Sequence, residues 1–152
     1  SVVDRGEQSF LELIRDNDLV LALDSLVHFG HWITPDMMPK RFDTHFYVAP
    51  APPDQIAAHD GRETTDSVWI GAQAALEAEE AGEAVIIFPT RMNLKKFATA
   101  SSVADAVDRF GRETVVTVKP QQSETPEGEP CLIIPEVEGY GQTVELLSRV
   151  NV

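Results

Sequence analysis

The sequence predicts a mixed α+β domain, and three observations lead to this fold class. Segments with apolar residues at helical spacing are interspersed with segments rich in aromatic and β-branched residues. Their order lacks the regular strand–helix–strand repetition of a doubly wound parallel sheet. The chain has 152 residues, of which 43% are hydrophobic and 24% charged, so it is long enough for one core of ordinary size.

The first third of the chain predicts one helix and a pair of strands. Residues 7–15 place apolar side chains at helical spacing. Residues 27–34 combine aromatic and β-branched residues before a proline, as strands do. Residues 41–49 alternate, and together the last two segments predict an antiparallel pair. The alternation assigns Phe42, Thr44, Phe46 and Val48 to one face and Arg41, Asp43, His45 and Tyr47 to the other.

The middle of the chain predicts a short strand and three helices. Residues 67–70 are apolar and aromatic, which favours a strand, and residues 72–81 are rich in Ala and Glu, which favours a helix. Thr90 is a candidate N-cap for a second helix. Ser102 is followed three residues later by an aspartate, which resembles a capping box, and Gly111 is expected to end that helix.

The tail differs in composition, so we divide the chain at residue 112. Residues 113–152 contain two strand-like segments, 114–118 and 131–134, joined by a Pro-, Glu- and Gly-rich stretch at 119–130 that predicts a long hairpin loop. Cys131, the single cysteine, sits in the second strand and is expected in the core.

The charge balance excludes some partners. Twelve Lys and Arg against 25 Asp and Glu give a net charge of −13, which argues against non-specific binding to nucleic acid or anionic membranes. With one cysteine, no internal disulfide can form, and we expect a cytoplasmic protein.

The four histidines give no predicted metal site. His28 and His31 are three residues apart on a predicted strand, so regular alternation puts them on opposite faces. His45 could meet Asp43 only along one strand, and His59 lies in a loop. We expect structural or solvent-facing roles for all four.

Three segments together resemble a known family. They are HWITP with KRFDTHFYVA, then HDGRETTDSVW, then FPTRMNL, and in this order they resemble the C-terminal half of Nudix hydrolases. The resemblance is closest to the branch of coenzyme-A and acyl-coenzyme-A diphosphatases, and it spans roughly residues 10–107.

The resemblance implies an α/β/α sandwich and Mg²⁺- or Mn²⁺-dependent attack of water on a diphosphate in a coenzyme-A-like or nucleoside diphosphate-linked substrate. In that family a glutamate-rich helix, the Nudix box, holds the metal, and the box is not present in this sequence. The sandwich is therefore expected to be incomplete, and this chain alone to be inactive. Either the box is supplied by a missing N-terminal half or a second chain, or the protein is a box-less module that binds without hydrolysing.

The resemblance also implies site residues. Glu63 matches an acidic position that completes the metal shell or acts as base, against the simpler interpretation of a solvated loop carboxylate. Arg41 and Asp43 are expected beside the substrate, with Arg41 either on a phosphate or paired with Asp43. Arg91, Asn93 and Trp32 complete the predicted substrate-binding set. Arg91 and Asn93 are polar groups at a helix start, for which an ordinary polar first turn is an equal alternative. Trp32 could stack on a base, although core packing is the favoured interpretation of its ring. An incomplete sheet would also leave an edge that favours a homodimer.

Overall fold

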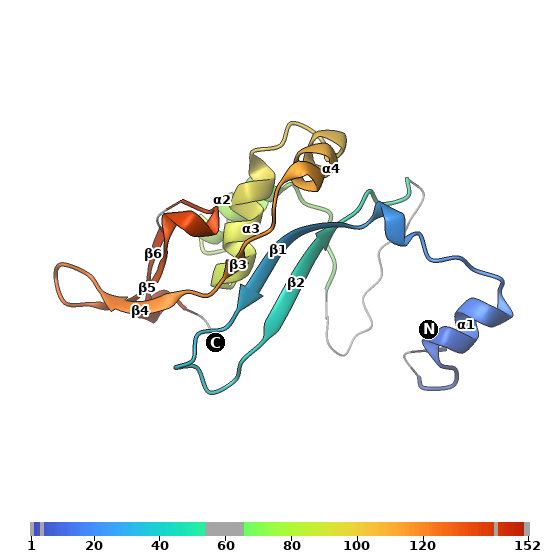
Figure 1. The fold of residues 1–152 in the computed structure, drawn as a ribbon, viewed down its shortest axis with the longest axis horizontal. Helices are drawn as coiled ribbons and strands as arrows, with labels where there is room; N and C mark the ends of the chain where they lie inside the picture. The colour runs from blue at the N-terminus through green and yellow to red at the C-terminus, as the bar shows by residue number, and fades with distance from the viewer. Residues whose placement is uncertain (1, 4, 54–65, 142, 151–152) are drawn as a thin grey trace. The chain divides into compact units, whose positions relative to one another are not determined.

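The structure is a computed structural model that describes residues 2–3, 5–53, 66–141 and 143–150. The chain divides into two compact units, which we describe separately. The first unit comprises residues 1–26 and 51–69, and the second comprises residues 27–50 and 70–152. Figure 1 labels the helices and strands of both. The mixed α+β class predicted from the sequence is confirmed.

The first unit contains helix α1 (Phe10–Asp16) and a 3₁₀ turn at Leu23–Ser25. Helix α1 begins with a full capping box, because Ser9 Oγ accepts from Glu12 N (3.2 Å) while Glu12 Oε2 accepts from Ser9 N (2.8 Å). None of the described residues of this unit is buried. Local capping, and not a hydrophobic core, therefore defines its helix.

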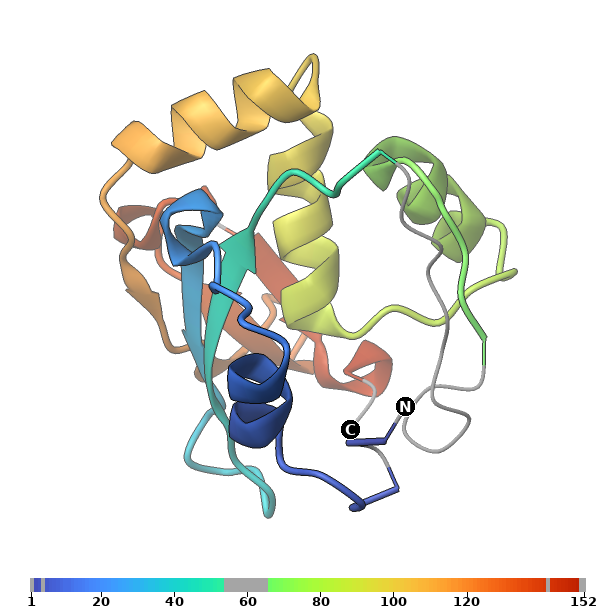
Figure 2. The same cartoon turned by 90° about the vertical axis from the view of Figure 1, so that its right-hand side faces the viewer.

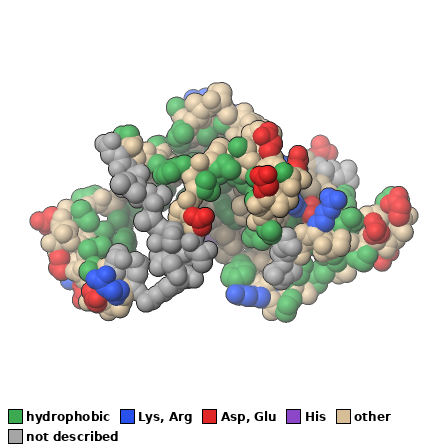
Figure 3. All heavy atoms as spheres, turned by 180° about the vertical axis from the view of Figure 1, so that it is seen from behind, with side chains coloured by type: hydrophobic (Ala, Val, Ile, Leu, Met, Phe, Trp, Pro, Cys, Tyr) green, Lys and Arg blue, Asp and Glu red, His purple; other side chains and the backbone are tan. Residues whose placement is uncertain are grey.

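Hydrophobic side chains of the first unit lie at the surface, and Val20 is 92% exposed. Figure 3 shows hydrophobic side chains at the surface of the molecule, mixed with acidic groups. No helix in the described parts of the chain has both the length and the apolar character needed to cross a bilayer.

The second unit is built on a three-stranded sheet with the order β2-β1-β3. Strand β1 (Val27–Ile33) pairs antiparallel with β2 (Asp43–Val48), as the alternation predicts. Strand β3 (Thr117–Val118) adds to the other edge of β1 in a parallel register, with His31 opposite Thr117. The predicted strand at 114–118 is thus reduced to its last two residues.

Three helices follow in the second unit: α2 (Ala72–Glu80), α3 (Phe88–Ala98) and α4 (Val103–Arg112). Ser102 Oγ accepts from Asp105 N (3.1 Å), so Ser102 caps α4 as predicted, but the capping box is incomplete because Asp105 Oδ2 accepts from Ser101 N (2.8 Å) and not from Ser102 N. Thr90 does not cap α3 but lies inside it, because the helix begins two residues earlier with Pro89 in its first turn, where the missing proline N–H costs no hydrogen bond.

A second sheet with the order β4-β5-β6 forms the tail. Its strands are Gln121–Glu124, Pro130–Ile134 and Thr143–Leu146, all antiparallel, with 3₁₀ turns at Glu136–Glu138 and Leu147–Arg149. The stretch predicted as one long loop therefore contains strand β4, and the turn between β4 and β5 is shorter than expected. Cys131 is 1% exposed, as predicted.

The core lies between the first sheet, α3, α4 and strand β5. One buried cluster joins the two sheets through α3; it consists of Trp32, Phe88, Met92, Val118, Leu132 and Ile134. A second cluster joins β1 to α4 through Phe29, Ala106 and Phe110. Figures 1 and 2 show α3 and α4 on the same side of the β1–β2 pair, so the opposite face of this sheet is left for polar groups.

A β-bulge interrupts strand β1. His28 pairs with Tyr47, but the next paired residue is Gly30, opposite Phe46, so one residue is added on the β1 side. The added residue shifts the alternation, so that His28 and His31 both contact His45. The prediction that they point to opposite faces is wrong for this reason. Residues 67–70, predicted as a strand, have no regular secondary structure in the described chain.

Candidate functional site

One apolar cavity of about 500 Å³ lies in the second unit. Its wall combines residues 32–35 at the end of β1, residues 87–90 at the start of α3, and the side of β2 that carries Phe42, Thr44 and Phe46. We call it the motif pocket, because these three stretches belong to the segments W-I-T-P, R-F-D-T-H-F and F-P-T. Its size lies within the ordinary range of small-ligand sites.

The motif pocket is mostly apolar, with few polar groups. Three threonine side chains and one lysine, Lys40, contribute to its lining. Lys40 Nζ lies 4.9 Å from the centre of the Phe42 ring, which itself is 55% exposed. The N-terminal end of α3 also borders the cavity and has no side-chain cap among the described residues. A helix start and an ammonium group at the margin of an apolar cavity favour a ligand with an apolar body and an anionic end.

The predicted substrate residues divide between the motif pocket and other places. Trp32 lines the pocket, with its ring edge-to-face with Phe88 at 5.8 Å. Arg41, Asp43, Arg91 and Asn93, all of which the structure describes, are not among the lining residues. Their role as substrate ligands stays a prediction.

Arg41 is paired, though not with Asp43. Its Nη2 lies 2.7 Å from Asp36 Oδ1, and its Nε donates to the Thr34 carbonyl (3.2 Å). Asp36 also accepts from Lys119 (2.6 Å), and this hydrogen bond, with the two nearby cations, holds the pKa of Asp36 below its ordinary value. Both ion pairs are exposed, so Arg41 could exchange Asp36 for another anion at little cost.

Arg91 and Asn93 are engaged inside the fold. Arg91 lies 2.6 Å from Glu79 and 2.6 Å from Glu145, with its side chain only 15% exposed. Asn93 is 4% exposed, and its Oδ1 accepts from the Tyr140 hydroxyl (2.6 Å). Burial raises the pKa of the Tyr140 phenol above its ordinary value, so this group is a neutral donor.

Glu63, the predicted catalytic and metal-binding carboxylate, lies outside the described residues. The residues that the structure describes bring together no carboxylate set that fits the Mg²⁺ or Mn²⁺ implied by the Nudix resemblance. Among the described residues, one group of three metal-binding side chains comes together, and two of its members are imidazoles. Imidazole is a poor ligand for Mg²⁺, so this group does not fit that ion.

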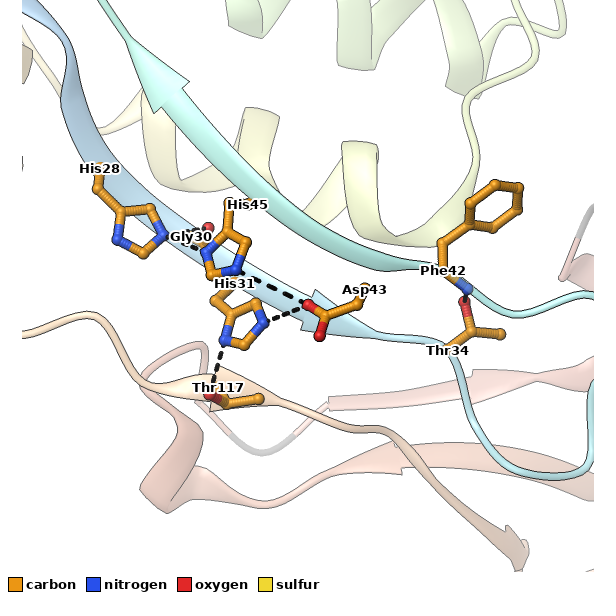
Figure 4. Close-up of polar contacts among 8 residues, drawn as sticks. All are labelled: His28, Gly30, His31, Thr34, Phe42, Asp43, His45 and Thr117. Atoms are coloured by element: carbon orange, nitrogen blue, oxygen red, sulfur yellow. Dashed lines mark hydrogen bonds and ion pairs between the residues drawn. The ribbon is translucent and has the colours of Figure 1, made fainter. Parts of the chain in front are cut away.

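That group, which we call the imidazole cluster, consists of His31, Asp43 and His45 on the polar face of the first sheet. His31 and His45 are cross-strand partners, and their rings stack in parallel at 4.0 Å. Asp43 Oδ1 lies 2.6 Å from His31 Nε2 and 3.8 Å from His45 Nε2. Figure 4 shows both Nε2 atoms directed toward the same carboxylate oxygen.

The remaining ring nitrogens of the imidazole cluster have partners too. His31 Nδ1 lies 2.7 Å from Thr117 Oγ1 on β3, and His45 Nδ1 lies 3.1 Å from His28 Nε2 on β1. Sequence reasoning missed this cluster because it considered His45 and Asp43 only along one strand and did not derive the register that sets His31 opposite His45. Gly30 could have revealed that His28 lies on the same face as His31, since a glycine within a strand often marks a bulge.

The comparisons with known proteins add no family to these observations. No protein-family model, no curated protein and no solved structure matches this chain.

Proposed function

We propose that this chain is the C-terminal part of a Nudix-type hydrolase. In this proposal the enzyme cleaves a diphosphate bond in a coenzyme-A-like or nucleoside diphosphate-linked substrate, and its fold is a Nudix-like α/β/α sandwich. The metal-binding glutamates would come from residues outside this sequence, on a preceding segment or a second chain. The isolated chain would then be inactive.

The observation that carries the proposal is the convergence of separate motifs on one cavity. Residues 32–35, 42–46 and 87–90 come from two strands and a helix, and all three stretches supply walls of the motif pocket. These stretches belong to two of the three segments that carry the resemblance to the coenzyme-A diphosphatase branch, and most of the third, HDGRETTDSVW, lies outside the described residues. Convergence on a cavity is what a binding role requires, whereas motifs that served folding alone could be dispersed.

The lining residues suit a substrate with two chemically different parts, one apolar and one charged. The apolar walls would cover an aliphatic chain or a base, while Lys40 and the start of α3 would face the charged phosphate end. Exposed apolar side chains in the first unit, such as Leu11 at 70%, are consistent with a further protein segment packing there.

Binding of coenzyme A to the purified chain, measured by calorimetry, tests the pocket. Phe42→Ala should weaken binding about fivefold to tenfold, because the ligand would cover the exposed half of a ring whose full burial is worth about 1.5–3 kcal/mol. Tyr47→Ala is the matched control, since Tyr47 is equally exposed (54%) on the other face of β2, where it stacks on His28. Equal affinities for the wild type and Phe42→Ala would refute the assignment of the pocket.

Turnover is tested separately. A longer product of the same gene that carries a Nudix box should hydrolyse coenzyme A or a nucleoside diphosphate derivative with Mg²⁺, whereas this chain alone should not. Undiminished hydrolysis by the isolated chain would refute the need for the box. Binding without turnover by the complete gene product would instead support the alternative function, a box-less binding module.

A further inference from the structure

The imidazole cluster has the donors of a transition-metal site. Two imidazole nitrogens and one carboxylate oxygen lie within 4.8 Å of one another, on the sheet face opposite α3 and α4. His31 is partly covered, with 17% of its side chain exposed, while 48% of His45 and 65% of Asp43 are exposed. An ion could therefore reach the cluster from solvent.

The ligand separations are close to those that a tetrahedral ion needs. Bonds of about 2.0–2.1 Å in a tetrahedron place the ligand atoms roughly 3.3 Å apart. Asp43 Oδ1 lies 2.6 Å from His31 Nε2 and 3.8 Å from His45 Nε2, so the two observed distances fall on either side of this value. Side-chain rotations that move the donor atoms by less than about 1 Å would make the two distances equal, while the cross-strand register holds the backbone in place.

The partners of the other nitrogens orient the two rings. An imidazole that binds metal through Nε2 carries its proton on Nδ1 and usually donates it to a neighbouring acceptor. Thr117 Oγ1 is such an acceptor for His31 Nδ1 at 2.7 Å. His28 Nε2 takes that role for His45 Nδ1 at 3.1 Å, once His28 no longer donates to the Gly30 carbonyl.

A simple hydrogen-bonded pair explains less of this arrangement. A bond from His31 to Asp43 accounts for the 2.6 Å contact, but it needs neither a second imidazole stacked at 4.0 Å nor an Nε2 atom directed at the same oxygen. Metal binding uses all three donors together. Metal binding also requires the rings of His31 and His45, whose planes now differ by 6°, to tilt so that the lone pairs of both Nε2 atoms point at one ion.

We propose that His31, Asp43 and His45 bind one divalent transition-metal ion, for which Zn²⁺ is the best fit. Two imidazoles and a carboxylate suit Zn²⁺ or Co²⁺, whereas Mg²⁺ and Mn²⁺ prefer oxygen ligands. Three protein ligands leave a fourth position for water. None of the three ligands lines the motif pocket, so the site goes beyond the proposed hydrolase activity.

The test is titration of the full chain, purified without a polyhistidine tag, with Zn²⁺ by calorimetry and with Co²⁺ by visible absorption. The wild type should bind one ion, and Co²⁺ should give the intense spectrum of a four-coordinate site. Excess Mg²⁺ should not displace the bound Co²⁺ or Zn²⁺. His45→Asn and Asp43→Asn should each weaken Zn²⁺ binding by more than the ~10- to 100-fold that loss of an outer-shell partner costs.

Two further variants act as controls. His28→Asn removes a histidine that touches His45 Nδ1 without being a ligand, so it should weaken binding by only about tenfold. Asp36→Asn removes an exposed carboxylate that is paired with Arg41 and Lys119, and should leave Zn²⁺ affinity unchanged. Circular dichroism of each variant checks that the fold persists.

The proposal would be overturned by a wild type that binds no Zn²⁺. It would also be overturned by His45→Asn binding as tightly as the wild type, or by Asp36→Asn losing as much affinity as Asp43→Asn. A six-coordinate Co²⁺ spectrum unaffected by Asp43→Asn would likewise contradict it. Retained binding in folded Asp43→Asn and His45→Asn proteins would place the ion elsewhere.

Discussion

Gly30→Ala should destabilise the second unit, because a Cβ at this position has too little room. It would lie 3.2 Å from the Tyr140 hydroxyl oxygen, 3.3 Å from Asn93 Oδ1 and 3.5 Å from Phe46 Cβ. The first two atoms are joined by a partly buried hydrogen bond of 2.6 Å, so both would have to shift by a few tenths of an ångström while keeping that bond.

The expected loss can be worked from these contacts. Overpacking of this kind costs about 1–3 kcal/mol, and replacing glycine by alanine returns about 0.4–1 kcal/mol through the unfolded chain. The net loss in the free energy of unfolding is therefore centred on roughly 1.3 kcal/mol, within a range from about 0 to about 2.6 kcal/mol. In urea denaturation followed by circular dichroism, this corresponds to a midpoint lower by roughly 1 M.

Gly111→Ala is the matched control. Gly111 lies within α4, and its added Cβ would meet only the two methyl groups of Val27, at 3.9 and 4.0 Å. That is ordinary van der Waals contact, so alanine should stabilise the helix by up to about 1 kcal/mol. If Gly30→Ala matched this control in stability, the close approach over β1 would not restrict the position and the reasoning would be refuted.

Three other outcomes follow from the buried polar groups. Arg91→Met should lower the free energy of unfolding by about 3 kcal/mol, since it leaves Glu79 and Glu145 without their cation. Arg41→Met should lower it by less than about 1 kcal/mol, because the ion pair of Arg41 is exposed. Equal losses in urea melts of the two variants would show that burial of the ion pair does not matter. Tyr140→Phe should cost about 1–3 kcal/mol at neutral pH, because it removes the acceptor of the buried indole N–H and the donor to the amide oxygen. Burial raises the pKa of Tyr140 in the folded state, so its contribution to the free energy of unfolding is complete below about pH 10 and is lost as the pH rises further. Between neutral and alkaline pH, the wild type should therefore lose more stability in urea melts than Tyr140→Phe does.

Local signals in the sequence predicted much of the secondary structure. The alternation of residues 42–48 identified the more buried face of β2, and Ser102 identified the start of α4. The same reasoning failed where long-range contacts decide. Residues 67–70 have strand composition but no pairing partner in the described structure, and β4 forms from a polar stretch because β5 pairs with it.

The candidate sites were harder to predict from the sequence than the secondary structure, because each of them depends on how several elements are arranged in three dimensions. The motif pocket needs β1, β2 and α3 to come together, which no single segment predicts. The imidazole cluster needs the cross-strand register that sets His31 opposite His45, and the bulge only adds His28 to the same face. Arg91 and Asn93 were predicted as ligand contacts from their place near a helix start, but their engagement by Glu79, Glu145 and Tyr140 depends on elements far away in sequence.

The Arg91 ion pairs have a consequence for how the fold opens. One guanidinium joins Glu79 on α2 and Glu145 on β6, so a single side chain on α3 links three elements. Separating α2 from α3, or β6 from α3, would expose a charge that had been matched inside. Amide hydrogen exchange should therefore report α2 and β6 as opening together, and Arg91→Met should let them exchange independently.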